Sequence, residues 1–227
     1  MTLRSRSKFA VAVVASALAA TLLIEAPLSP RLDAAEPLPP ADGPREPRVA
    51  PIKGDDGLWQ QSWFLPSFLD LKDDHAEARA KGRRFAVIFE QRGCIYCTKL
   101  HTEILSQAYI NDYVRLNFNV VQLDLWGSRE VTDFDGQKMP EKKLAERWGV
   151  MFTPTIVFFH ENLAQAGGAW GPPLEVARLQ AGLGADSVYD MLVWVRARIY
   201  EQDRNFQRFH IARITEREAH AAGAAPK

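Results

Sequence analysis

Three short apolar runs along the chain have the length and residue types of buried β-strands. They cover residues 84–90, 117–124 and 150–159, and each is rich in Val, Ile, Leu or Phe. Pro154 lies near the start of the third run, where a strand residue need not donate a ladder hydrogen bond. Residues 174–181 follow a glycine-rich connection and form the predicted partner strand of the third run.

Helical spacing of apolar residues fills the stretches around these runs. The predicted helices are residues 68–81, 95–106, 140–148 and 187–200. In the first of them, the residues expected to face inward are Leu69, Leu71, Ala76 and Ala80. Asp135-Gly136, between residues 130–132 and 137–139, predicts a small hairpin. Strands that alternate with helices in this way indicate an α/β fold.

The N-terminal end has the pattern of an export signal. Three basic residues within the first eight positions precede an uncharged apolar run over residues 9–24, which is the order of an n-region and an h-region. Asp33 stands where the Ala34-Ala35 cleavage site needs a small residue. We therefore predict that residues 1–26 are a signal peptide or a retained membrane anchor. Either outcome places the protein in the periplasm.

Composition and charge change this picture little. The 227 residues, 47% of them hydrophobic, suffice for a sizeable core. The 28 basic and 28 acidic residues balance, so no nucleic-acid partner is expected. Residues 27–57 are rich in proline and predict an extended linker. Residues 58–202 are the predicted folded domain, and residues 203–227 a polar tail that is either a solvated helix or disordered.

The candidate chemistry lies in the only two cysteines, Cys94 and Cys97, which are two residues apart. They fall between a predicted strand and a predicted helix, which places Cys94 at a helix N-terminus. Unpaired N–H groups and the positive end of the helix dipole favour a thiolate there. Cys94 is therefore the candidate nucleophile, and Cys97 is placed to resolve a mixed disulfide on it. This thiol–disulfide chemistry needs no cofactor.

Two other interpretations of the cysteines remain open. A purely structural disulfide that closes so short a loop would stabilise the fold weakly. A metal-binding or carrier module could use Cys94, Cys97 and His101 as soft ligands. Structural zinc sites usually need four ligands and no fourth is nearby, so no metal is predicted. His101 is expected to lie on the helix surface.

With these elements in place, the chain resembles a known superfamily. The order of strand, Cys94-Ile95-Tyr96-Cys97, helix, strand, helix, Thr153-Pro154, two strands and helix is similar to the thioredoxin fold, a central mixed sheet flanked by helices. The segment of residues 140–150, followed by Thr-Pro-Thr and an apolar strand, resembles the periplasmic thioredoxin-like proteins of the SoxW type, which are associated with bacterial sulfur oxidation. The resemblance covers residues 68–200.

The resemblance implies a function and further site residues. It implies a cis Thr153-Pro154 bond beside the cysteines, with Thr153, Pro154 and Tyr96 binding substrate. It also implies a periplasmic thiol–disulfide oxidoreductase that reduces a disulfide-bearing client protein and is reduced again by a membrane electron donor. A dithiol oxidase is the alternative, because direction depends on redox potential and partners.

The chain also departs from thioredoxin itself, which has Gly-Pro between its cysteines and a buried Asp six positions before the first. Here Ile95-Tyr96 separates the cysteines and Ile88 takes the place of the Asp. Arg92-Gly93 replaces the usual Trp and puts positive charge near Cys94. Glu90 is the nearest carboxylate. We expect it to be either a partly buried proton acceptor for Cys97 or a solvated residue at a strand end.

Overall fold

The computed structural model describes residues 37–164, 170–180 and 184–223. The predicted signal or anchor of residues 1–26 lies outside the described residues, as do the first ten residues of the predicted linker. Within the described part of the chain, no helix is both long and apolar enough to cross a membrane.

A four-stranded mixed sheet forms the centre of the fold, with strand order β4-β3-β7-β8. β3 (Arg84–Glu90) pairs in parallel with β4 (Phe118–Asp124). β7 (Thr155–Phe159) pairs antiparallel with both β3 and β8 (Glu175–Gln180). Three of these strands were predicted from the apolar runs and β8 as the partner of the third; the structure confirms all four, with β7 beginning at Thr155 rather than at residue 150.

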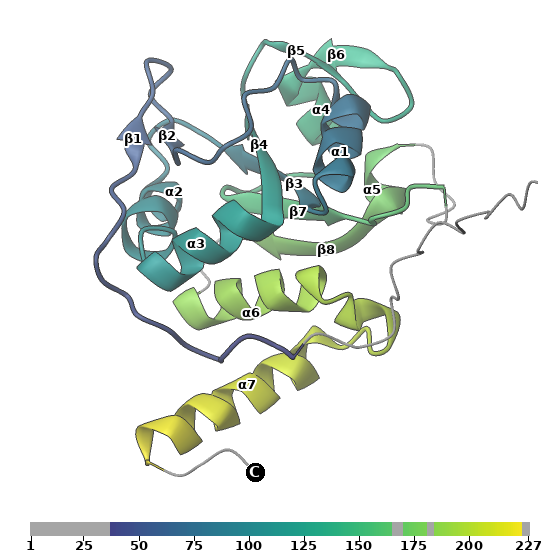
Figure 1. Cartoon of the computed structure of the whole chain (residues 1–227). Helices are drawn as coiled ribbons and strands as arrows, with labels where there is room; N and C mark the ends of the chain where they lie inside the picture. The colour runs from purple at the N-terminus through teal and green to yellow at the C-terminus, as the bar shows by residue number, and fades with distance from the viewer. Residues whose placement is uncertain (1–36, 165–169, 181–183, 224–227) are drawn as a thin grey trace, which may run out of the picture. The chain divides into compact units, whose positions relative to one another are not determined.

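Helices cover both faces of this sheet (Figure 1). α3 (Ala108–Asn117) and α6 (Ala185–Arg196) enclose one apolar cluster against the sheet, and α1 (Leu71–Ala80) and α4 (Glu141–Arg147) enclose the other. Every residue of β3 is buried, because a strand covered on both faces has no solvent side. The predicted α/β fold, a central mixed sheet flanked by helices, is confirmed.

Two small hairpins lie outside this sheet. β5 (Glu130–Thr132) pairs with β6 (Lys138–Pro140), as the Asp-Gly turn predicts. β1 (Ile52–Lys53) pairs with β2 (Trp59–Gln60) in a part of the sequence where we expected a linker and the start of the domain. This β1–β2 hairpin lies beside α2 (Ile95–Lys99) (Figure 1).

The first helix differs from its prediction in both its start and its buried face. It begins at Leu71, because Leu69 adopts a positive φ of 64° and the side chain of Asp70 caps the helix by accepting from two backbone N–H groups. Ala76 and Ala80, expected to face inward, are exposed. The buried residues of this helix are Leu71, Asp74, His75 and Ala78. Apolar spacing alone gave the wrong face because two of these four residues are polar.

The proline-rich residues 37–57 lie against the domain rather than apart from it. The guanidinium of Arg213, in α7 (Phe206–Ala221), donates to the carbonyl oxygens of Pro39 and Pro40 at 2.8 and 2.7 Å. Val49 N donates to Ser106 O at 2.8 Å. On the side of the proline-rich segment, backbone groups make these contacts, so the spacing of its apolar side chains does not indicate them. The remaining short helices are α5 (Gly171–Leu174) and the 3₁₀ turn η2 (Ile199–Glu201).

Candidate active site

The two cysteines form a disulfide at the junction of β3 and α2. Cys94 is the N-cap residue of α2, with an extended backbone, and its Sγ accepts from Cys97 N at 2.9 Å. Gly93, with a φ of +73°, makes the turn that brings the chain from strand to helix. Cys94 retains 9% of its exposure and Cys97 only 3%. The two sulfurs are thus unequal in the sense expected of a nucleophile and a resolving cysteine.

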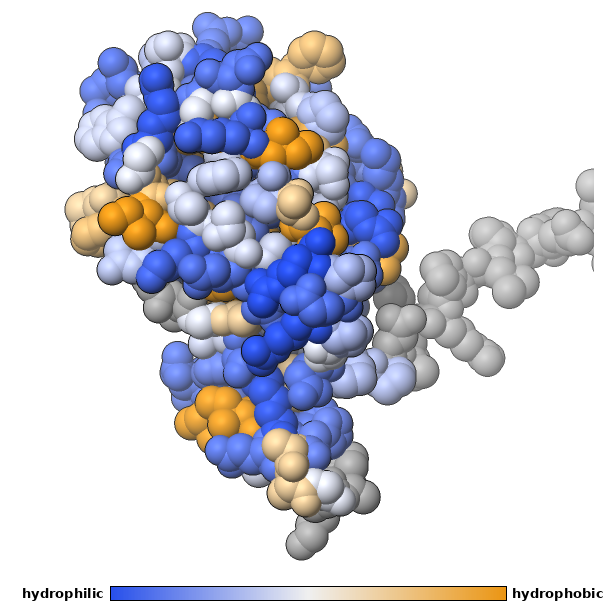
Figure 2. Space-filling model, turned by 90° about the vertical axis from the view of Figure 1, so that its left-hand side faces the viewer, coloured by the Kyte–Doolittle hydropathy of each residue, from blue (hydrophilic) through white to orange (hydrophobic). Residues whose placement is uncertain are grey.

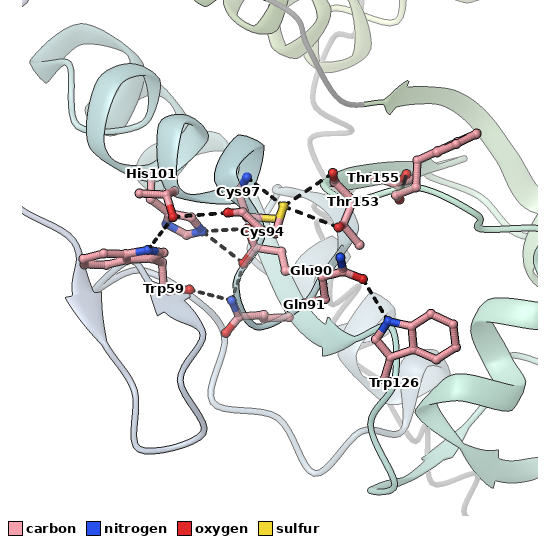
Figure 3. Close-up of a disulfide and its surroundings, with 12 residues drawn as sticks. Trp59, Glu90, Gln91, Cys94, Cys97, His101, Trp126, Thr153 and Thr155 are labelled. Atoms are coloured by element: carbon pink, nitrogen blue, oxygen red, sulfur yellow. Dashed lines mark hydrogen bonds and ion pairs between the residues drawn. A yellow bond between two sulfur atoms is a disulfide. The ribbon is translucent and has the colours of Figure 1, made fainter.

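The loop before β7 lies directly against Cys94. The Thr153-Pro154 bond is cis, as the resemblance implies. The Thr153 carbonyl oxygen lies 3.5 Å from Cys94 Sγ, and the Thr153 hydroxyl donates to the same sulfur at 3.4 Å (Figure 3). A thiol on Cys94 would have that carbonyl oxygen as its acceptor after reduction. The structure therefore brings together Cys94 and Thr153, which are 59 positions apart in the sequence.

Glu90 lies behind the disulfide, at the end of β3, and is 1% exposed. His101 Nε2 lies 2.9 and 3.0 Å from its two carboxylate oxygens, and the side-chain amide of Gln122 donates to it as well. Glu90 and both cysteines line a common cavity of about 140 Å³. The interpretation of Glu90 as a solvated residue is therefore wrong. Its role as a proton acceptor stays a prediction.

His101 is fully buried, which corrects the expectation of a surface position. It lies in a π-helical turn, η1 (Leu100–Ile104), that continues α2. Its Nδ1 is 3.2 Å from the Gln61 amide nitrogen, so both ring nitrogens have partners in the protein. With the ring engaged in this way, His101 is not free to complete a metal site with the cysteines. No group of three or more potential metal ligands was found among the described residues.

Sequence reasoning missed the residues that enclose the far side of this cavity. Trp59 Nε1 donates to Thr98 Oγ1 at 3.0 Å, and the Trp59 carbonyl oxygen accepts from Gln122 at 2.6 Å. Gln61 reaches His101 from the same N-terminal region. One signal was available for His101 itself, since it follows Cys97 by four positions and therefore shares its helix face. The partners from the N-terminal region gave no comparable signal.

The outer side of the disulfide is apolar and exposed. Large exposed hydrophobic residues flank Cys94 on neighbouring segments: Ile95, Tyr96, Trp126, Met151 and Phe152. Trp126 Nε1 donates to Gln91 Oε1 at 2.8 Å, which holds the indole near the turn before Cys94 (Figure 3). Figure 2 views the side of the molecule that carries α2 and shows apolar side chains in small groups separated by hydrophilic ones. Tyr96, predicted to bind substrate, is 56% exposed.

The strand order, the helices on both sheet faces and the disulfide at the β3–α2 junction define a thioredoxin fold. A family model described as a thioredoxin-like domain matches residues 71–178. No curated protein matches the chain. Together, the matched domain and the Cys94–Cys97 pair support thiol–disulfide oxidoreductase activity.

Three solved structures are similar to parts of this chain. A thioredoxin-fold protein from Helicobacter pylori is 19% identical, with a TM-score of 0.47, over 59% of this chain and 83% of that one. A thioredoxin from Thermus thermophilus is 26% identical, with a TM-score of 0.41, over 54% and 81%. A structure described as DsbH oxidoreductase is 15% identical, with a TM-score of 0.40, over 70% and 96%.

Proposed function

We propose that this protein is a periplasmic reductase of disulfides in exported client proteins, of the SoxW type, and that it works through Cys94 and Cys97. The observation that carries the proposal is the inequality of the two sulfurs. Cys94 caps α2 and contacts the Thr153 loop, whereas Cys97 is the more buried and lies one turn further into the helix. A nucleophile needs access to a client, and a resolving thiol needs access only to Cys94.

The reaction has two exchange steps. In the first, the Cys94 thiolate attacks one sulfur of the client disulfide, so a Cys94–client disulfide forms and the other client sulfur leaves as a thiolate. In the second, the Cys97 thiol gives up its proton and attacks Cys94 Sγ. The second client sulfur leaves, and the Cys94–Cys97 disulfide seen in the structure is the product. Two electrons pass from the dithiol to the client.

Glu90 is the proposed acceptor of the Cys97 proton. It lines the same cavity as Cys97, and it is the one acidic side chain among the residues that line it. Its carboxylate accepts a hydrogen bond from the Gln122 amide, lies within hydrogen-bond distance of His101 Nε2, and has no Lys or Arg within 4 Å among the described residues. General-base assistance of this kind contributes about 10²–10⁴-fold in rate.

The outer side of the site suits a protein client. A second cavity, of about 320 Å³, is lined by Tyr96 from the Cys-x-x-Cys segment and by the cis Pro154, together with Ile156 and Leu179 among others. Lys99 and Glu103 also line it. The exposed groups of Tyr96 and Met151 extend the apolar surface around the disulfide. An extended client segment could place an apolar side chain here while its disulfide meets Cys94.

The periplasmic location rests on the N-terminal sequence. The apolar run of residues 9–24 with its basic flank has the order of an export signal, whether cleaved or kept as an anchor. In the periplasm a reductase must be returned to its dithiol form, so the proposal includes a membrane electron donor that reduces the Cys94–Cys97 disulfide.

The proposal is tested by trapping. Cys97→Ser removes the resolving thiol, so Cys94 should hold the client as a mixed disulfide that survives non-reducing electrophoresis. The matched control is the double variant Cys94→Ser, Cys97→Ser, which has no thiol to trap with. Periplasmic extract of cells expressing the single variant should give discrete adducts that disappear on reduction. An adduct pattern identical in the two variants would refute the assignment of Cys94.

A further inference from the structure

We propose that His101 is a positioning residue. Its imidazole is neutral, carries its proton on Nε2 and donates it in a hydrogen bond to the Glu90 carboxylate, so the carboxylate is held in place without a positively charged partner. This inference rests on the proposed function, because it concerns how Glu90 serves Cys97. It also assigns a role to Gln61 and Asn111, two buried amides that the exchange chemistry itself does not use.

A backbone carbonyl fixes the orientation of two buried amides, those of Asn111 and Gln61. The oxygen of Leu105 can only accept, and it lies 2.9 Å from Asn111 Nδ2, which fixes the orientation of that amide. The same Nδ2 donates to Gln61 Oε1 at 3.2 Å, so the Gln61 nitrogen must face His101 Nδ1, at 3.2 Å. Gln61 therefore donates and Nδ1 accepts. The ring proton is on Nε2 and points at the carboxylate of Glu90.

The tautomer determines what faces the Glu90 carboxylate. An imidazolium ion at hydrogen-bond distance would set a positive charge against the carboxylate and oppose proton transfer to it. A neutral ring donates a hydrogen bond but supplies no positive charge. His101 is also blocked as a relay, because a proton on Nδ1 would meet the amide N–H of Gln61. The proton from Cys97 thus stays on Glu90 until it leaves through the cavity that the two residues share.

The other titratable and charged groups around Glu90 do not place a positive charge against its carboxylate. The two cysteines approach from α2, Lys53 lines the far side of the cavity from β1, and Asp124 occupies the neighbouring register position on β4. The Gln122 amide is uncharged and donates to Glu90. Within 4 Å, the Glu90 carboxylate has no Lys or Arg partner among the described residues.

The controlling amide comes from outside the segment that matches the thioredoxin-like domain. Gln61 precedes that segment, which begins at residue 71. It belongs to the same N-terminal region as Trp59, whose carbonyl oxygen accepts from Gln122. The N-terminal region therefore touches both donors to Glu90, and we infer that it tunes the proton acceptor of this site.

The tautomer is tested directly in the folded, oxidised protein. At neutral pH, imidazole ¹⁵N chemical shifts should show His101 with one protonated nitrogen, Nε2. A ring protonated on Nδ1, or on both nitrogens near neutral pH, would overturn the inference. This measurement uses the wild-type chain and does not depend on any client.

The effect on Glu90 is tested by the pH profile of the resolution step, started from a mixed disulfide between Cys94 and a fluorescent peptide. His101→Leu removes a hydrogen bond to the carboxylate, so the acid limb should move up by about one pH unit, and resolution below the wild-type midpoint should be roughly tenfold slower. Gln61→Glu should force a proton onto Nδ1 and move the limb down. His101→Gln keeps an N–H donor and should retain the wild-type midpoint.

Two outcomes separate this inference from the proposed function. If Glu90→Gln removes the acid limb but His101→Leu leaves its midpoint unchanged, Glu90 is the acceptor and His101 does not position it. If Glu90→Gln leaves the limb in place, the acceptor role itself fails. If His101→Leu does not fold, the other two variants test the inference. It would be overturned if the midpoint of the acid limb moved in the same direction in Gln61→Glu and in His101→Gln, because only Gln61→Glu should move it.

Discussion

The two sides of the Cys94–Cys97 disulfide differ in almost every physical respect. On the outer side, Tyr96 and Met151 are 56% and 73% exposed. On the inner side, Glu90 and His101 are 1% and 0% exposed and are linked by hydrogen bonds. One disulfide therefore separates an apolar surface that can meet a client from a buried polar network that can take up a proton. Substitutions on the two sides should change different steps of the reaction.

The largest effect should come from the sulfur that faces outward. Cys94→Ser should abolish catalytic turnover of a protein disulfide, because no nucleophile remains on the accessible side. Cys97→Ser should lose turnover but keep one round of attack, seen as a single equivalent of mixed disulfide by mass spectrometry. Insulin reduction followed by turbidity measures the first effect. Turnover that persists in Cys94→Ser would contradict the division of roles.

On the inner side, Gln122→Leu should lower the stability of the oxidised protein by about 1–3 kcal/mol. The substitution removes a donor from buried Glu90 and from the Trp59 carbonyl oxygen. Urea unfolding measures the change. Gln137→Leu, at an exposed position of the β5–β6 turn, is the matched control and should stay within about 0.5 kcal/mol of wild type. Equal losses in the two variants would mean that the inner network does not stabilise the fold.

On the outer side, Met151→Ser should lower kcat/KM for a protein client a few-fold, in line with the loss of about 1 kcal/mol of apolar contact. The rate with a small aromatic disulfide should stay within roughly twofold of wild type, because that substrate can reach Cys94 without contacting the surrounding apolar surface. Stability should hardly change, since the side chain is 73% exposed. A loss that is the same for both substrates would argue against a docking surface.

The smallest effect should come from the hydroxyl that contacts Cys94. Thr153→Val removes a donor that lies 3.4 Å from the sulfur and should raise the pKa of the reduced Cys94 thiol, because one hydrogen bond to the thiolate is lost. Wild-type Cys94 should titrate below the free value of about 8.5, owing to its helix N-terminal position. The rate of alkylation against pH gives both values. A wild-type pKa at or above the free one would contradict the assignment of Cys94 as nucleophile.

The sheet could be predicted well from the sequence, because a buried strand requires apolar residues at consecutive positions of the chain. β3 and β7 contain continuous apolar runs, which a strand covered by helices on both faces needs, whereas Asn119 and Gln122 interrupt the apolar residues of β4. Helix α1 was predicted less well. Its buried face includes Asp74 and His75, and their partners, the Ser67 hydroxyl and the His160 carbonyl oxygen, offset the cost of burying polar atoms.

The buried hydrogen-bond network around Glu90 could not be predicted from the sequence, for a different reason. Glu90 and His101 are 11 positions apart and could be placed on facing elements. Gln61 and Asn111 are 50 positions apart, and nothing in their local spacing links them. Polar residues in loops and on helices are ordinarily solvated, so their burial becomes visible only when the chain is folded.

The most direct measurement separates the two exchange steps in Glu90→Gln. Stopped-flow fluorescence with a disulfide peptide times the attack by Cys94 and the resolution by Cys97 in one experiment. With the proton acceptor removed, resolution should slow by about 10²-fold at neutral pH while attack stays nearly unchanged. Equal slowing of both steps, or no slowing of either, would contradict the claim that the buried side of the disulfide handles the proton.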